Sequence, residues 1–331
     1  MWQGLMVCIA LTAAGVGLGQ LPLLADNGVS PLVVALLLGI VIGNLPVSRR
    51  LTDTAAGLKF ATRWLLRTGI VLFGLSLTLQ QIMALGPKVL LLDILIISCV
   101  LVSGYFIGTR LLGMDRETTL LTSAGSAICG AAAVLATEST IRARPAATSM
   151  AVATVVLFGS LAMLVYPLLY PLMGMDEGLF GVYIGATVHE VAQVVAAGEA
   201  VGPEALVNAV IVKLVRVMLL VPFLLIVGQW WLARGDGAAE VGTKGGLVIP
   251  WFAFGFMAMV VFNSFITLPA FLHDGLVLAG QLSLTMAMAA LGYETRLERL
   301  RSLGMRPFIL ALILFALLLG GGGLASQWLM G

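Results

Sequence analysis

Three residues that could carry chemistry lie close together in the stretch GATVHEVAQVVAAG, residues 185–198: His189, Glu190 and Gln193. The stretch invites comparison with the zinc-protease pattern HExxH, in which two histidines one helical turn apart bind the metal. Gln193 stands where the second histidine would be, and no cysteine or histidine cluster elsewhere offers replacement ligands. The sequence therefore argues against a metal site here.

An ion-coupling site explains the same three residues better. An ionisable side chain within a membrane span is costly and normally faces the protein interior or a water-filled path. His189 also has the residue type that titrates near physiological pH, as a proton-coupling group needs. We therefore predict that His189, Glu190 and Gln193 couple transport to H⁺ or Na⁺. The alternative is a shallow segment in which His189 and Glu190 touch interfacial water.

Two cations follow in NAVIVKLVRVMLL, within a segment that is otherwise apolar from Ala205 to Trp231 apart from Asn208. Lys213 and Arg216 are three residues apart and so share one face of a helix. They lie roughly 13 to 17 Å from the start of that segment, at a rise of 1.5 Å per residue. Snorkelling to the surface explains such a depth poorly. We expect an anionic partner: Glu190, Glu138 or the substrate itself.

A second unusual segment is TTLLTSAGSAICGAAAVLATEST, residues 118–140. Its small residues make a poor continuous span, because glycine allows a helix to break. A break at mid-membrane exposes N–H groups at a helix start, and their partial positive charge attracts an anion. The alternative is close helix packing through small residues. The predicted anion cradle consists of Ser123, Gly125, Ser126, Cys129 and Gly130.

Further polar residues lie in apolar spans. Asn263, in VFNSFITLP, is a candidate substrate contact or a hydrogen-bond partner for another helix. Arg67 either anchors a helix at the inner interface or contacts substrate. Glu138 and Asn208 complete the set of weaker candidates.

These residues require elements that hold them inside a membrane. The 331 residues are 60% hydrophobic and 10% charged, with a mean hydropathy of +1.08, whereas soluble domains average about 25% charged residues. Apolar runs of about 18 to 25 residues recur, each long enough to cross a hydrocarbon core of about 30 Å as a helix. We predict an all-α polytopic membrane protein that forms one integral domain over residues 1–331. The net charge of +2 gives no indication of a nucleic-acid partner.

Charge placement predicts which segments cross. Lys and Arg concentrate in cytoplasmic loops. An amino terminus in the cytoplasm, nine crossings and two broken or re-entrant segments, at 119–139 and 179–198, put every loop Lys or Arg except Lys88 on the cytoplasmic side. Eleven full crossings satisfy the rule slightly less well. The eleven apolar segments are 4–24, 30–46, 60–84, 89–112, 119–139, 146–173, 179–198, 205–232, 247–271, 275–293 and 307–329.

A weak internal repeat predicts an inverted duplication. The stretch GLSLTLQQIMALG, residues 74–86, aligns with GYETRLERLRSLG, residues 292–304, at both glycines and at two leucines. The predicted topology sends the two copies through the membrane in opposite directions, as an inverted repeat requires. The predicted repeats cover about residues 1–140 and 175–331.

Four motifs together resemble those of a known family. In chain order they are LLRTGIVLFGLSLTLQQI, SAGSAICGAAAV, YIGATVHEVAQVVAAG and AMAALGYETRLERLRSLG, and they are spread over most of the chain. The sequence resembles the sulfate exporter family of bacterial inner-membrane proteins. The resemblance implies a secondary transporter with discontinuous helices and inverted symmetry that moves sulfate or a related sulfur oxyanion.

The sequence therefore favours a secondary transporter of a small inorganic or organic anion, working by alternating access with H⁺ or Na⁺ coupling. A cation/proton antiporter is the main alternative, and a channel or an intramembrane enzyme are remote ones. We expect no enzymatic activity, no cofactor and no metal. The expected partners are the anion and the lipid bilayer, and a homodimer is compatible with the sequence. The three cysteines lie in apolar segments, and no disulfide is expected.

Overall fold

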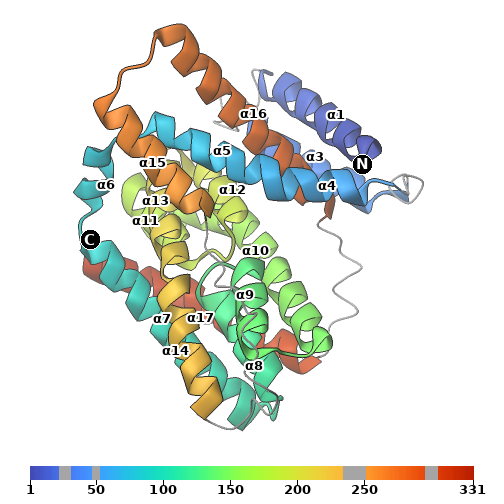
Figure 1. Ribbon diagram of the computed structural model, residues 1–331, viewed down its shortest axis with the longest axis vertical. Helices are drawn as coiled ribbons and strands as arrows, with labels where there is room; N and C mark the ends of the chain where they lie inside the picture. Colours follow the sequence, from blue (N-terminus) through green and yellow to red (C-terminus); the bar gives the residue numbers. More distant parts are fainter. Residues whose placement is uncertain (22–30, 47–52, 234–250, 295–304) are drawn as a thin grey trace. The chain divides into compact units, whose positions relative to one another are not determined.

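A computed structural model describes residues 1–21, 31–46, 53–233, 251–294 and 305–331. Within these ranges every regular element is a helix (Figure 1), which confirms the predicted all-α class. The chain divides into two compact units that interleave along the sequence. Unit 1 comprises Met1–Gly86, Val195–Val207 and Trp251–Glu298, and unit 2 comprises Pro87–Val194, Asn208–Pro250 and Arg299–Gly331.

Among the described residues, six helices are long and apolar enough to cross a membrane, which confirms the polytopic prediction. The apolar segments 30–46 and 247–271 form shorter helices, α3 (Pro31–Asn44) and α15 (Trp251–Phe265). Residues 47–52, 234–250 and 295–304 include many of the cations used to orient the chain, and they lie outside the described residues together with most of the second repeat copy. The six long helices are Trp2–Gly19, Lys88–Leu111, Pro145–Met173, Pro203–Ala233, Ala270–Glu294 and Met305–Met330.

Unit 1 is built around α16 (Ala270–Glu294), which packs against α3, α5 (Leu66–Phe73) and α1 (Trp2–Gly19). The α3 and α16 backbones approach closely, because a Cβ at Gly39 would lie 2.9 Å from the Tyr293 nitrogen and one at Gly292 would lie 3.0 Å from the Ile40 nitrogen. Small residues allow this proximity where the bilayer supplies little hydrophobic drive for helix association. The remaining described elements that lie wholly in unit 1 are α4 (Ala55–Phe60), the π-helical turn η2 (Ala61–Leu65), the 3₁₀ turn η3 (Gly74–Ser76), α6 (Leu79–Leu85) and α15.

The segment 60–84, predicted as one continuous span, is instead interrupted. After η3 the chain is extended at Leu77 and Thr78 before α6 begins. Backbone groups at such a break lose their helical partners and need others, because lipid supplies none. The sequence analysis missed the break because its apolar residues continue through it.

Side chains of α15 and α16 bond to this break. The Asn263 amide donates to the Leu77 carbonyl oxygen over 3.0 Å, and the Leu79 N–H donates to the Ser264 hydroxyl over 2.7 Å. His273 Nε2 lies 3.2 Å from the Leu75 carbonyl oxygen. Asn263, predicted as a substrate contact or a hydrogen-bond partner for another helix, thus bonds the extended break between η3 and α6.

Replacing Ser264 by alanine should destabilise unit 1 at this break. The partly buried Leu79 N–H would lose its acceptor, and a typical hydrogen bond contributes about 0.5–1.5 kcal/mol. Ser283→Ala is the matched control, because the Ser283 hydroxyl bonds the Ala279 carbonyl oxygen within its own helix. Thermal unfolding of the purified protein in detergent should give a lower Tm for Ser264→Ala than for Ser283→Ala. Equal Tm values would contradict the assignment.

Unit 2 contains α7 (Lys88–Phe106) with the π-helical turn η4 (Ile107–Leu111), α8 (Arg116–Ala127), α9 (Ala131–Ile141), α10 (Pro145–Met173), α11 (Glu177–Thr187), α14 (Leu220–Ala233) and α17 (Met305–Met330). The boundaries between the units fall within α12 (Val191–Val201) and α13 (Pro203–Met218). The segments 119–139 and 179–198 are both broken, as predicted. The breaks are at Ile128–Gly130 and at Val188–Glu190.

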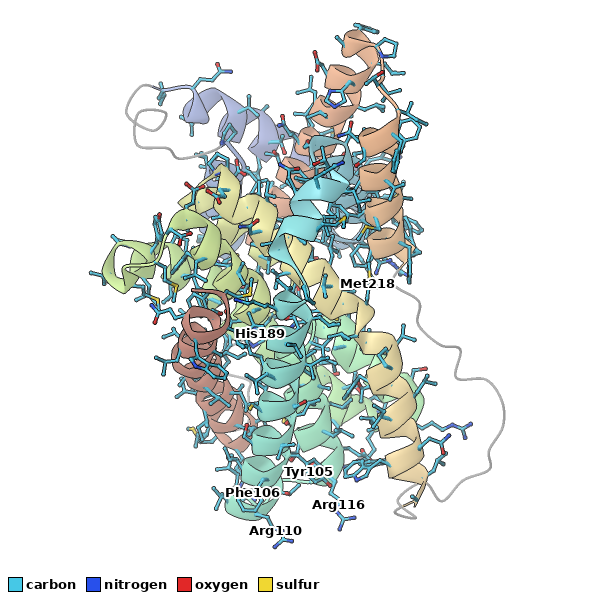
Figure 2. All side chains as sticks on the ribbon, turned by 90° about the vertical axis from the view of Figure 1, so that its left-hand side faces the viewer. Tyr105, Phe106, Arg110, Arg116, His189 and Met218 are labelled. Atoms are coloured by element: carbon cyan, nitrogen blue, oxygen red, sulfur yellow. The ribbon has the colours of Figure 1, made fainter. Side chains whose placement is uncertain are left out.

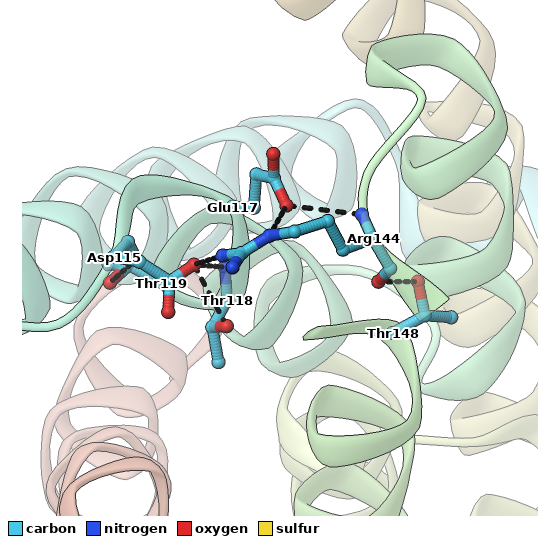
Figure 3. A network of polar contacts seen from close by, with 6 residues as sticks. All are labelled: Asp115, Glu117, Thr118, Thr119, Arg144 and Thr148. Carbon is cyan, nitrogen blue, oxygen red and sulfur yellow. Dashed lines mark hydrogen bonds and ion pairs between the residues drawn. The ribbon is translucent and has the colours of Figure 1, made fainter. Parts of the chain in front are cut away.

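The first broken segment, α8 with α9, has its two ends joined by ion pairs. Arg144, which follows α9, pairs with residues at the start of α8: its Nε lies 2.8 Å from Glu117 Oε2, and its Nη2 lies 3.0 Å from Asp115 Oδ1 (Figure 3). Asp115 Oδ1 also accepts from the Thr118 N–H as the cap of α8. The hydrogen bond and charge of Glu117, with the charge of Asp115, raise the pKa of the Arg144 guanidinium. The segment therefore begins and ends at the same place.

Candidate functional site

The break between α8 and α9 depends on Gly130. Its φ of +68° and ψ of −136° belong to a region that only glycine occupies readily. A Cβ at Gly130 would also collide with the Glu190 side chain. Glu190 Oε1 accepts from the Ala131 N–H, the first of α9, over 3.1 Å. The helix start that the sequence analysis predicted as an anion cradle thus already holds a carboxylate of the protein itself.

The second break lies at the centre of HEVAQ. Val188, His189 and Glu190 are not helical, and α12 starts at Val191. The Glu190 N–H donates to Gln193 Oε1 over 3.0 Å. This is one half of a capping box, in which a side chain of the first helical turn accepts a hydrogen bond from the backbone N–H of the residue that precedes the helix. His189 and Glu190 therefore lie in the break of the predicted broken segment, and Gln193 lies in the first turn of the helix that follows.

Lys213 of α13 connects the two breaks. Its Nζ donates to the Ile128 carbonyl oxygen over 2.7 Å and to the Val188 carbonyl oxygen over 2.6 Å. Ile128 and Val188 are the C-terminal caps of α8 and α11. A cation at a helix C-terminus is stabilised by the macrodipole, and hydrogen bonds from a charged donor are short and strong. A single ammonium group therefore satisfies the ends of two half-helices.

Arg216, one helical turn further along α13, has a partner that the sequence analysis did not name. Its Nε lies 3.1 Å from Asp93 Oδ1 on α7, and both side chains are fully buried. The two charges form an ion pair without hydrogen-bond geometry, and neither Asp93 oxygen nor Arg216 Nη1 or Nη2 has a hydrogen-bond partner among the described residues. The expected partners Glu190 and Glu138 are not the group that faces Arg216.

The site lies deep inside unit 2. Lys213 and Arg216 are 0% exposed, so snorkelling does not account for them; His189 is 1% exposed, whereas Glu190 is partly exposed. Figure 2 shows His189 well away from Arg110 and Arg116, which lie at one end of unit 2 where α7 gives way to α8. The charges of Lys213 and Arg216 act on His189, and those of Asp93 and Glu190 act on Lys213. The predicted ion-coupling residues and cations therefore form one buried cluster.

Several buried polar groups in this part of unit 2 have no hydrogen-bond partner among the described residues. They include both ring nitrogens of His189, the hydroxyls of Ser126 and Tyr166, and Nε2 of Gln193. Buried polar groups in proteins are normally hydrogen-bonded. A set of unsatisfied donors and acceptors around buried charges is typical of a place that water or a polar ligand occupies.

The other predicted site residues divide between the cluster and its surroundings. Cys129 lies in the first break, whereas the Ser123 hydroxyl donates to the Thr119 carbonyl oxygen of its own helix. A Cβ at Gly125 would meet the side chains of Val134 and Val155, which indicates a packing position. The Asn208 amide bonds the Gly178 carbonyl oxygen over 3.1 Å. In unit 1, the half-buried Arg67 guanidinium lies over the Phe252 ring at 5.6 Å.

Asp93 is the site residue that sequence reasoning missed. It stands alone in KVLLLDILIISCV, a run with no other charge after its first lysine. A single acid in an apolar span was a sufficient signal, since such residues mark function by default. Its partner could not be identified from the sequence, because α7 and α13 lie about 120 residues apart in the chain.

Replacing Gly130 by alanine should destabilise the protein. The backbone strain at this φ is on the order of 1–3 kcal/mol for a residue with a Cβ, and the Glu190 side chain would have to move. Gly320→Ala in α17 is the control, because a Cβ there meets nothing within 4 Å. Thermal unfolding should show a clear loss of Tm for Gly130→Ala and none for Gly320→Ala. An unchanged Tm for both variants would refute this role of Gly130.

Replacing Lys213 by methionine should loosen the first break. The Ile128 and Val188 carbonyl oxygens would lose the charged donor that joins them. Cys129, 4% exposed between Ile128 and Gly130, reports on this directly. In a background with Cys8 and Cys99 replaced by serine, Cys129 should react with a maleimide at least several-fold faster in Lys213→Met. Lys88→Met at the exposed start of α7 should leave the rate unchanged, and an equal rate in both variants would count against the bridge.

The long apolar helices and the buried charges at two helix breaks define a multi-pass integral membrane protein. The chain belongs to the family described as conserved hypothetical protein 698, whose model matches residues 3–311. It is 46% identical to a UPF0324 membrane protein of Pseudomonas aeruginosa, over 98% of this chain and 93% of the relative. It is 43% identical to UPF0324 inner membrane protein YeiH of Escherichia coli K12, over 97% and 92%.

A third relative, a UPF0324 membrane protein of Bordetella pertussis, is 44% identical over 97% of this chain and 92% of its own length. No solved structure matches the chain. The relatives and the apolar helices establish a bacterial multi-pass inner-membrane protein. Their names state a family and a location, so the substrate implied by the resemblance to the sulfate exporter family belongs to the proposal that follows.

Proposed function

We propose that this protein is a secondary transporter of a small anion, and that Arg216 is the anion's principal contact. The supporting observation is that Arg216 is fully buried while its Nη1 and Nη2 have no hydrogen-bond partner among the described residues. These two nitrogens offer a planar fork that matches the two oxygens of a carboxylate, sulfonate or sulfur oxyanion. A sulfur oxyanion, as the family resemblance implies, fits this chemistry.

The environment of Arg216 favours an anion over a cation. Both nearby carboxylates are already engaged: Glu190 accepts from the start of α9 and Asp93 faces Arg216. A cation/proton antiporter would need one of them to leave its partner, whereas an anion can bind to donors that have none. The Ser126 hydroxyl and the His189 ring are further groups able to donate to an oxyanion.

The charges of the cluster support coupled transport. With His189 neutral, Lys213 and Arg216 balance Asp93 and Glu190. An added anion would leave uncompensated charge in a buried site, which is strongly unfavourable. Transport therefore requires H⁺ or Na⁺ to accompany the anion. Alternating access, in which the site opens to one face of the membrane at a time, completes the proposal. An enzymatic role is not part of it.

Replacing Arg216 by glutamine should abolish saturable anion flux in proteoliposomes. The neutral amide keeps hydrogen-bond donors but loses the charge and the fork, and leaves Asp93 unpaired. We expect a loss of at least tenfold, since charge-assisted bonds to a buried ligand contribute more than about 1.4 kcal/mol. Glu190→Gln and Lys213→Ala should also reduce flux. Arg110→Gln, at the exposed end of α7 with η4, is the control.

The assay distinguishes the alternatives. Radiolabelled sulfate and methanesulfonate are suitable first substrates, with vesicles made with and without Na⁺ and with a pH gradient of either direction. Anion flux that survives all three substitutions at the wild-type rate would remove the mechanism. Na⁺- or H⁺-driven cation exchange without any added anion would instead establish the antiporter. Single-channel currents rather than saturable flux would indicate a channel.

A further inference from the structure

We infer that Asp93 is the residue that couples anion binding to proton uptake: the anion neutralises the Arg216 charge on which Asp93 depends, and the Asp93 carboxylate then accepts a proton. This inference rests on the proposed function and deepens it. Asp93 is outside the residues His189, Glu190 and Gln193 that the sequence analysis assigned to coupling. The observation that supports this role is the ion pair between Asp93 on α7 and Arg216 on α13.

Asp93 has very few contacts that stabilise its charge. Among the described residues neither of its oxygens has a hydrogen-bond partner, and the Arg216 Nε at 3.1 Å is its one ion-pair contact. A buried carboxylate is stable as an anion only when it is paired or hydrogen-bonded. Glu190 differs, because it also accepts a backbone N–H at a helix start. The charge of Asp93 therefore depends on Arg216 far more than that of Glu190 depends on any single cation.

The anion and Asp93 compete for the charge of one guanidinium group, that of Arg216. An oxyanion that bonds Arg216 Nη1 and Nη2 neutralises the charge that Asp93 relies on. Breaking a buried ion pair by removing one partner costs about 3–5 kcal/mol. Binding one proton avoids this cost, because a neutral carboxyl group needs no counter-ion. The anion and Asp93 can then both remain in the buried site.

The proton balance follows directly. The Asp93 carboxylate takes one proton from the aqueous phase on the side where the anion enters, and becomes a carboxylic acid. Release of the anion on the other side frees Arg216, the ion pair forms again, and the proton leaves with the anion. One proton accompanies each anion, and a monovalent anion moves without net charge.

The charged and titratable groups around Asp93 are few. Besides α13, which brings Arg216 to Asp93, the helices packed against α7 include α8, α11 and α17. Their charged residues lie in their first turns (Arg116, Glu117, Glu177 and Arg306), and α11 also carries Tyr183. The charges that act on Asp93 are those of Arg216 and Lys213, both on α13. Lys213 is bonded to the Ile128 and Val188 carbonyl oxygens, and the charge of Glu190 also acts on it. Arg216 is therefore the group whose capture changes the state of Asp93.

Isothermal titration calorimetry tests the inference on the full-length protein in detergent. Sulfate is the main probe, since it keeps its double charge across the neutral pH range, and methanesulfonate is the singly charged probe. Titrations in two buffers of different ionisation enthalpy measure the protons taken up per anion. We expect about one proton for the wild type, and an affinity that falls about tenfold per pH unit once Asp93 is ionised in the free protein.

Asp93→Asn should remove this linkage. Anion binding should then take up no proton through position 93 and should lose its pH dependence, while Arg216 still binds the anion. Asp93→Glu should restore proton uptake. Asp274→Asn, at a side chain that is 80% exposed, is the matched control and should behave as the wild type does.

The outcomes separate this inference from the proposed function. Anion binding by the wild type without proton uptake would overturn the role of Asp93, even if Asp93→Asn fails to fold. Proton uptake that persists in Asp93→Asn would also overturn it, and would leave Arg216 as the anion contact. If the wild type binds neither probe and carries no anion flux, the proposed function itself fails.

Discussion

The arrangement of unit 2 depends on one interaction: the Lys213 ammonium group that bonds the carbonyl oxygens of Ile128 and Val188. Two helices stop inside a hydrophobic protein, and each leaves carbonyl groups that neither lipid nor a following helical turn can satisfy. A charged donor between the two helix ends forms hydrogen bonds with carbonyl oxygens of both. This fixes where α13 must pass, and so where Arg216, three residues further on, must lie.

The position of Lys213 also determines which residues stand at the helix start that follows the first break. A buried ammonium group requires compensating negative charge nearby, and Glu190 supplies it while bonding the first N–H of α9. Gly130 then has to be glycine, both for its φ of +68° and because the Glu190 side chain occupies the space beside it. Small residues at this break are thus a consequence of the charge arrangement, rather than of close helix packing alone.

Unit 1 solves the same problem with neutral groups. Its break at Leu77 and Thr78 is bonded by the amide of Asn263 and the hydroxyl of Ser264. Neutral partners satisfy a broken backbone without creating a charge that must be balanced. In unit 2 the partners are ionised and buried, so their energy changes whenever an ion or a proton arrives. This physical difference is why we assign transport chemistry to unit 2 and a structural role to the break in unit 1.

Local sequence patterns were sufficient to predict an all-α membrane protein, the breaks within residues 119–139 and 179–198, and the unusual positions of His189, Glu190, Lys213 and Arg216. These features could be predicted because hydropathy and glycine content are local properties of the sequence. A segment that crosses the bilayer must also satisfy its own backbone hydrogen bonds, which favours a helix. Only the tertiary structure decided that Asp93 faces Arg216, that Lys213 joins two helix ends, and that Asn263 bonds a break missed in segment 60–84. Pairings between distant helices depend on packing, which no local pattern of residues specifies.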